Sequence, residues 1–367
     1  MKALVIGGTG PTGPYVVEGL LERGYRVTIL HRGTHEVEFS KPVEHIHGDP
    51  HFEDTLEAAL GKNTYDVTVA LYGRLRFVAQ VMRGKTGQFL AVGGVAVYKG
   101  WSNPALTGPC PFPAREDSPL QTDPDLENFS HLMYISEQAA LEAHRQGHYR
   151  ATVFRYPLIY GPRQLAPREW SLIRRFRDGR KEVILPDAGL VLETRGYVEN
   201  MAHTVLLAAD NPKAASGQVY NVGDDVVLNQ REWVEVVGKA LGCQFEIVDM
   251  PGRMARPSRP YAGRSHHRVL DINKIKAQLG YRDIVPVEEA LRRTVKWYQD
   301  NPPPPGGELE KQLNDPFNYD YEDRLIAQHR QATEALLAIP FQREKFRHPY
   351  PHPKRPGAAH GTPLGGP

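Results

Sequence analysis

The N-terminal residues change their hydrophobic pattern twice within a short stretch. Leu4, Val5 and Ile6 form a continuous apolar run, which is typical of a strand buried in a parallel sheet. After a glycine-rich break, apolar residues recur at helical spacing over residues 16–21. This order predicts a strand, a tight turn and a helix at the start of the chain.

Further apolar runs follow at the spacing of a repeated strand and helix. They cover residues 26–30, 43–46, 66–71 and 88–92, with helices expected between them. Strands that alternate with helices in this way pair into a parallel sheet. The sequence therefore predicts an α/β fold of the Rossmann type with a doubly wound parallel sheet.

The rest of the chain is expected to divide into two further parts. Residues 1–160, with returning segments near 190–225, are predicted to form the nucleotide-binding domain, and residues 161–300 mainly a smaller substrate-binding region. Residues 301–307 read Asn-Pro-Pro-Pro-Pro-Gly-Gly, a stiff stretch followed by a hinge.

The C-terminal part, residues 301–367, is predicted to carry a helical extension and a flexible tail. Apolar residues recur at helical spacing from Leu325 to Leu337, and a lone amphipathic helix must bury that face. It can cap the cleft, pack on a second subunit or lie on the sheet domain. Past His348 the chain is rich in Pro and Gly, which predicts an extended arm or disorder.

The glycine-rich break has the spacing of a dinucleotide-binding turn. Glycines three residues apart let the backbone turn sharply, lie close to a pyrophosphate and pack the helix against its strand. The amides at the helix start then face the phosphates. A purely structural glycine turn is the alternative. The residues expected to contact the cofactor here are Gly7, Thr9, Gly10, Pro11, Thr12 and Gly13.

The second predicted strand ends in His31 and Arg32, where many NAD-binding folds carry an acidic residue for the ribose hydroxyls. An arginine at this place can instead meet a 2′-phosphate, which favours NADP(H) over NAD(H). Stacking of Arg32 on the adenine, or exposure to solvent, is the alternative. Asp49, after the third strand, is expected to accept a hydrogen bond from the adenine amino group.

Composition excludes several other classes of protein. Across 367 residues the formal net charge is +2, so no global field marks a nucleic-acid or membrane protein. No apolar run approaches the ~18 residues of a membrane helix, and no signal peptide precedes the first strand, so we expect a cytoplasmic protein.

Cys110 and Cys243 have no C-x-x-C spacing, which argues against a disulfide scaffold or a zinc ribbon. The spacing of His45, His47 and His51 does not aim them at one ion, so we expect no metal.

Several longer motifs strengthen this interpretation. The segments are Gly-Gly-Val-Ala-Val-Tyr at residues 93–98, Phe-Arg-Tyr-Pro-Leu-Ile-Tyr-Gly-Pro at 154–162, Arg-Gly-Tyr-Val-Glu-Asn at 195–200 and Val-Tyr-Asn-Val-Gly at 219–223. With them the chain resembles an extended short-chain dehydrogenase/reductase of the NAD-dependent epimerase/dehydratase type. It is nearest to an atypical branch that includes the chloroplast stem-loop-binding proteins. The resemblance covers residues 1 to about 301.

The resemblance implies further cofactor contacts and a catalytic set. Leu71 and Tyr72, after the fourth strand, are expected beside the cofactor. Tyr156, Pro157 and Ile159 match the segment that lies along the nicotinamide in the family.

The catalytic set implied by the family is incomplete in this chain. The family uses a tyrosine as acid or base, a lysine four residues later that lowers the pKa of the tyrosine, and a Ser or Thr at the end of the fifth strand. Tyr134 is expected at the tyrosine position. The alternative is that Tyr134 is a structural aromatic residue beside the cofactor. Gln138 then stands in place of lysine and Gly94 in place of serine. Gln138 brings no charge that would help a tyrosine act as a base, so Tyr134 is expected to serve as an acid.

Two arginine-rich stretches favour an anionic substrate. They cover residues 163–180 and 253–268, and segments like these hold a nucleotide diphosphate in the resembling epimerases. A solvated basic face is the alternative, and basic grooves also suit single-stranded RNA.

These features predict an NAD(P)-dependent enzyme that reduces, epimerises or dehydrates a polar, anionic or sugar-like small molecule. No membrane partner is expected, nucleic acid is disfavoured, and a homodimer stays open. A cofactor-binding regulator without turnover and an RNA-binding relative of the stem-loop proteins are the alternatives.

Arg32 gives a direct test of the cofactor choice. We expect NADPH to bind more tightly than NADH, and Arg32→Ala to remove most of the difference, on the order of 1–3 kcal/mol for a charge-assisted contact. Calorimetric titration with both cofactors measures it. Equal affinities in the parent protein would show that Arg32 does not recognise the phosphate.

Overall fold

The structure is a computed structural model that describes residues 1–33, 37–255, 266–342 and 356. The chain forms two compact units, residues 1–317 and 318–367. Within the described residues, no helix has both the length and the apolar composition needed to cross a membrane. The first unit contains the sheet and every predicted site residue.

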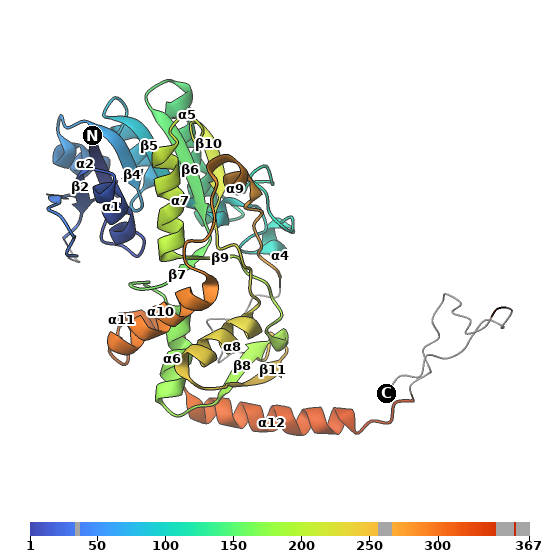
Figure 1. Cartoon of the computed structure of the whole chain (residues 1–367). Helices are drawn as coiled ribbons and strands as arrows, with labels where there is room; N and C mark the ends of the chain where they lie inside the picture. Colours follow the sequence, from blue (N-terminus) through green and yellow to red (C-terminus); the bar gives the residue numbers. More distant parts are fainter. Residues whose placement is uncertain (34–36, 256–265, 343–355, 357–367) are drawn as a thin grey trace. The chain divides into compact units, whose positions relative to one another are not determined.

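A seven-stranded parallel sheet forms the centre of the first unit (Figure 1). Its spatial order is β10-β6-β5-β4-β1-β2-β3, so the order reverses beside β1 and β4. The predicted Rossmann-type fold is confirmed. The strands are β1 (Lys2–Ile6), β2 (Arg26–His31), β3 (Glu44–His47), β4 (Tyr65–Ala70), β5 (Thr86–Gly94), β6 (Arg150–Tyr156) and β10 (Gln218–Asn221).

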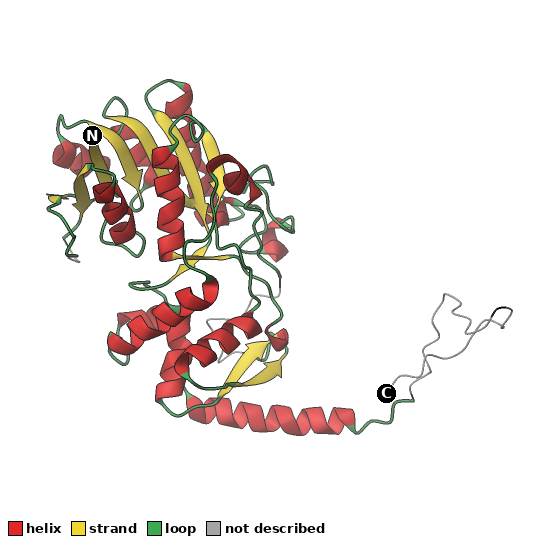
Figure 2. Ribbon diagram, in the orientation of Figure 1, coloured by secondary structure: helices red, strands yellow, loops and turns green. Residues whose placement is uncertain are grey.

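Helices cover both faces of this sheet, and Figure 2 shows the strands in yellow between them. The apolar run of β1 has no exposed surface because it lies in the middle of the sheet. The predicted apolar stripe of the first helix is also buried. One face carries α1 (Gly13–Glu22), α7 (Val198–Asp210) and α9 (Asn273–Leu279); the other carries α2 (Glu53–Leu60), α3 (Leu75–Val81) and α5 (Asn128–Arg145).

A smaller lobe follows the sheet within the same unit, in the lower part of Figure 1. A separate apolar cluster holds it together, around Trp170, Trp233 and Tyr298. Two parallel strand pairs belong to this half of the chain, β7 (Leu158–Tyr160) with β9 (Arg195–Tyr197) and β8 (Glu182–Pro186) with β11 (Glu246–Met250). Its helices are α6 (Arg168–Arg177), α8 (Gln230–Leu241), α10 (Val287–Asp300) and α11 (Glu308–Leu313). The loop after β5 carries η1 (Val95–Val97) and α4 (Pro104–Thr107), and η2 (Asp187–Gly189) follows β8.

The second unit contains the predicted helical extension as α12 (Tyr319–Leu337). Asn318 caps this helix, since its side chain accepts a hydrogen bond from the Tyr321 amide. The expected tail after His348 lies outside the described residues except for Pro356. The three alternatives for the apolar face of α12, namely a cleft, a second subunit or the sheet domain, stay predictions.

Asp224 joins the end of the sheet to the smaller lobe. Its carboxylate accepts hydrogen bonds from the Tyr160 hydroxyl at 2.7 Å, the Tyr197 amide at 2.9 Å and the Asn200 side chain at 3.0 Å. Burial, with the nearby charge of Asp283, raises the pKa of Asp224 to about 7. These partners hold strands β7 and β9 and helix α7 on one carboxyl group.

Asp224 predicts a distinctive pH dependence of stability. The folded state keeps a proton that the unfolded chain releases near pH 4, so the stabilisation is complete below pH 4 and is lost as pH rises towards 7. In the parent protein, the free energy of unfolding should fall by about 2–4 kcal/mol between pH 4 and pH 7. We expect this fall to be absent in Asp224→Asn, because asparagine does not titrate. Denaturant unfolding over a pH series measures it, with Asp125→Asn at an exposed loop position as control. Parallel curves for the parent and Asp224→Asn would contradict this account.

Candidate functional site

The turn after β1 has the geometry that a bound pyrophosphate requires. Gly7 has a φ of +88°, and a Cβ there would lie 2.5 Å from Cβ of Tyr72. A Cβ at Gly13 would collide with the Gly8 carbonyl group, so α1 packs directly on the turn. Gly10 differs, because a Cβ there would meet only the Gly7 oxygen at an ordinary 3.5 Å. The outer side of the turn at Gly10 is therefore open.

The residues predicted at the adenosine end lie beside this turn. The Arg32 guanidinium lies 5.4 Å from the ring centre of Tyr72, and its stacking on adenine stays a prediction. Asp49 accepts hydrogen bonds from the amide and the ring of His51, at 3.0 and 2.7 Å. These two bonds lower the pKa of Asp49, which therefore stays ionised. The contacts of Arg32 with a phosphate and of Asp49 with adenine stay predictions.

His31 at the end of β2 faces its histidine neighbours and not an open site. Its Nδ1 accepts the Gly33 amide, and its Nε2 lies 3.0 Å from Nδ1 of His45. Among the described residues, no group of three His, Cys, Asp or Glu side chains is arranged to hold a metal ion.

A cavity of about 630 Å³ opens where strands β4, β5 and β6 end. Ligands of open α/β sheets bind at this edge, beyond the carboxyl ends of the strands. Leu71, Gly94, Tyr156, Pro157 and Ile159 of the predicted site line it. The other lining residues are Gly73, Arg74, Leu75, Arg76, Val92, Gly93, Phe129, Leu132, Met133 and Ser136.

Helix α5 presents a different face to the cavity from the predicted one. The lining residues Phe129, Leu132, Met133 and Ser136 recur at helical spacing, whereas Tyr134 and Gln138 do not line the cavity. Tyr134 packs beside the apolar cluster that contains Val95, Tyr98 and Trp101, as Met133 also does. The structure thus does not bring the predicted pair to the cavity, and its catalytic role stays a prediction.

A buried ion pair fixes which face of α5 is turned to the sheet. Both carboxylate oxygens of Glu137 accept from Arg155 on β6, at 2.6 and 2.9 Å, and both side chains are buried. Arg155 also donates to the Tyr98 hydroxyl, which donates to Asn221 at the end of β10. Burial raises the pKa of Tyr98 to about 12, so it remains a neutral donor. With Glu137 held on β6, the residues four and eight positions before it, Met133 and Phe129, line the cavity.

Phe129 and Met133 are four residues apart and line the same cavity as the end of β5. A Cβ on Gly94 would lie 2.7 Å from the terminal methyl of Met133. The tyrosine and lysine that the family resemblance implies have the same four-residue spacing. The residue of α5 that meets Gly94 is therefore Met133, whose thioether exchanges no proton. Arg155 was the signal in the sequence that could have identified the cavity-lining face of α5. A buried arginine needs an acid on the facing helix, and that acid, Glu137, determines which face of the helix is turned to the sheet.

The hydroxyl groups that line the cavity are already engaged. Ser136 donates to the Leu132 carbonyl at 2.7 Å, and Tyr156 donates to the Met201 carbonyl at 2.9 Å. Burial raises the pKa of Tyr156, so this phenol stays protonated at neutral pH. Neither hydroxyl is available as a base.

Four described arginines of the two basic stretches are held by protein carboxylates: Arg168, Arg174, Arg175 and Arg268. On α6, Arg174 pairs with Asp178 and Glu310, and Arg175 pairs with Asp315. Buried Glu193 joins Arg168, Arg195 and Arg268 in one cluster. Arg256, Arg259 and Arg264 lie outside the described residues. The solvated basic face is therefore not observed on α6, and these paired arginines are structural.

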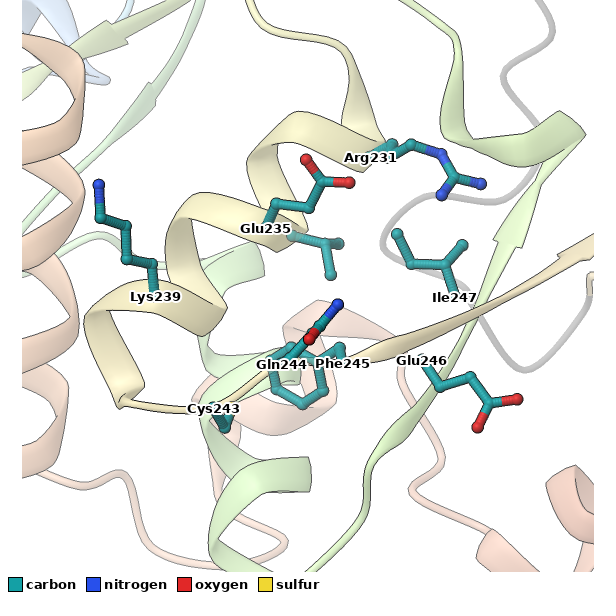
Figure 3. Close-up of a pocket in the computed structure, with 9 residues that line it drawn as sticks. Arg231, Glu235, Lys239, Cys243, Gln244, Phe245, Glu246 and Ile247 are labelled. Carbon is teal, nitrogen blue, oxygen red and sulfur yellow. The ribbon is translucent and has the colours of Figure 1, made fainter.

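A second cavity, of about 610 Å³, lies between α8 and β11 (Figure 3). Arg231, Glu235 and Lys239 border it from the helix, and none of its lining residues belongs to the predicted site. Burial raises the pKa of Cys243 in its lining, so the thiol is not activated. The cavity at the sheet edge is the better candidate site, because strand ends and the dinucleotide turn share that edge.

Comparison of the sequence with known protein families agrees with the Rossmann-type fold and with the glycine turn after β1. The model of the NAD-dependent epimerase/dehydratase family matches residues 3–87 and 77–223, which is more than half of the chain. The chain belongs to this family.

Individual relatives are distant. Sterol-4-alpha-carboxylate 3-dehydrogenase, decarboxylating, from Mus musculus is 25% identical over 339 residues, 80% of this chain and 90% of that protein. Chloroplast stem-loop binding protein of 41 kDa b from Arabidopsis thaliana is 23% identical over 309 residues, 79% of this chain and 77% of that protein. With three other curated relatives, this chain spans only about half of the length of the relative, 46–51%.

Solved structures show the same fold. The crystal structure of UDP-glucose 4-epimerase with UDP-glucose from Thermotoga maritima superposes with a TM-score of 0.67 at 21% identity. The match covers 82% of this chain and 99% of that one.

The buried ion pair between Glu137 and Arg155 predicts a large mutational effect. We expect Glu137→Gln to lower the free energy of unfolding by about 3–5 kcal/mol, because it leaves a buried guanidinium charge without its counter-charge. Glu142→Gln on the same helix is the matched control, since the pair of Glu142 with Arg145 is exposed and should contribute little. Denaturant unfolding measures both. Similar losses for the two variants would mean that the buried pair does not anchor α5.

Proposed function

We propose that this chain binds a nicotinamide dinucleotide and uses it to reduce, epimerise or dehydrate an anionic metabolite. One observation carries the proposal. The glycine turn after β1 and the cavity at the ends of β4, β5 and β6 lie along one edge of the sheet, next to the position where the strand order reverses. This is the arrangement that a two-part nucleotide cofactor needs.

The residues present fit such a cofactor. The open side of Gly10 leaves room for a pyrophosphate beside the start of α1. Arg32 and Asp49 would serve the adenosine half, and Tyr156, Pro157 and Ile159 the nicotinamide half. When bound, the nicotinamide supplies or takes up a hydride. NADP(H) is the proposed preference because Arg32 follows β2.

The molecules for which two similar proteins are named support an anionic substrate. The mouse relative is named for a sterol carboxylate, and the Thermotoga maritima epimerase was crystallised with UDP-glucose. A sugar nucleotide or another organic anion is therefore the proposed substrate class.

A second candidate, a cofactor-binding protein without turnover, is favoured by one observation. Phe129, Met133 and Gly94 line the cavity, and none of them can donate or accept a proton. Turnover would then need Tyr134 as the acid, from outside this lining, or a proton delivered by water. The RNA-binding alternative loses support, because the described arginines on α6 are mostly paired with carboxylates.

Gly10→Ala tests cofactor binding without disturbing the fold. A methyl group there makes only an ordinary contact with the protein, but it occupies the open side of the turn. We expect unchanged thermal unfolding without cofactor and a loss of NADPH affinity of tenfold or more, measured by calorimetry. Mass spectrometry of small molecules released from the denatured parent identifies a retained cofactor. If the parent binds neither NADPH nor NADH, the proposal fails.

A further inference from the structure

A short connection brings two arginines to the cavity. Only four residues, 71–74, separate the end of β4 from the start of α3. Arg74 and Arg76 both line the cavity as a result. They lie outside the basic stretches discussed above.

These two arginines differ from Arg168, Arg174 and Arg175 on α6 because neither forms an ion pair with a described residue. Aromatic rings hold them instead. The Arg74 guanidinium lies 5.5 Å from the ring centre of Phe52 and 5.8 Å from that of Phe77, and Arg76 lies 4.6 Å from Phe77. A guanidinium stacked on a ring keeps its N–H groups free for a carboxylate or phosphate. Two arginines without a carboxylate partner among the described residues therefore line the cavity.

The remainder of the cavity wall is apolar. Leu75, Leu132, Met133 and Ile159 contribute aliphatic surface. Phe129, also in the lining, is 66% exposed and adds an aromatic ring that a ligand can cover. Since the hydroxyls of Ser136 and Tyr156 donate to backbone carbonyls, few groups remain to bind the hydroxyls of a sugar.

We propose that this cavity binds an amphipathic anion, with an apolar body against Phe129 and Met133 and a carboxylate or phosphate held by Arg74 and Arg76. The inference rests on the proposed function for the placement of this molecule beside the nicotinamide, and it narrows the substrate class. A molecule that presents only sugar hydroxyls to this wall would leave its own polar groups unpaired.

Binding of a simple amphipathic probe tests the proposal in the full chain. Decanoate, decyl phosphate, neutral decanol and UDP-glucose are titrated by calorimetry, with and without saturating NADPH. We expect both anions to bind, decanol to bind at least tenfold more weakly, and affinity to rise by up to about fourfold per methylene from hexanoate to decanoate.

Variants locate the bound anion. Arg74→Gln combined with Arg76→Gln should weaken decanoate at least tenfold, whereas Arg83→Gln, an exposed arginine just after α3, should not. Phe129→Ser changes an exposed side chain, so the fold is retained, and it should reduce the gain per methylene.

The outcomes separate this inference from the proposed function. Decanoate binding that the arginine pair does not affect, equal binding of decanol, or competition by UDP-glucose alone would overturn it. Loss of NADPH affinity in the double variant with unchanged decanoate affinity would assign the arginines to the cofactor and also overturn it. A failure of NADPH to bind at all, with decanoate still bound at Arg74 and Arg76, would refute the proposed function but not the anion site.

Discussion

The buried ion pair between Arg155 and Glu137 determines what this protein can present to a ligand. A charge without its partner is costly inside a protein, so α5 must keep Glu137 on the sheet at every stage of folding that buries Arg155. Once that contact is made, helical geometry alone decides which side chains lie over the strand ends. Phe129 and Met133 reach the cavity because of a contact that lies beneath them.

Charge is distributed by the same logic over the rest of the first unit. Carboxylates lie beside three of the arginines of α6, and three arginines surround Glu193, so the positive charge of these residues serves packing. Asp224 holds three donors at the junction of the sheet and the smaller lobe. Arg74 and Arg76 are different because aromatic rings, not acids, surround them. The contrast shows why a count of arginines along the sequence is a poor guide to where an anion binds.

The fold could be predicted well from the sequence, because local patterns determine it. The run from Leu4 to Ile6, the glycines and the following helix each depend on neighbours within a few residues, and all three elements occur as expected. The face of α5 could not be predicted in the same way. Tyr134 and Met133 are adjacent in sequence but lie about 100° apart around a helix, and only the distant Arg155 decides between them. The role of the arginines was equally non-local, since Arg174 and Arg175 find partners more than a hundred residues away.

The contact between Gly94 and Met133 makes these two positions interdependent. Any side chain at 94 needs the space that the methionine methyl fills, and a shorter or differently directed residue at 133 would leave a void beside the glycine. Substitutions here should be epistatic: the effect of one depends on whether the other has already occurred. A polar side chain introduced at 94 alone would collide with the methionine methyl, so a functional group could be built at the end of β5 only together with a change on α5.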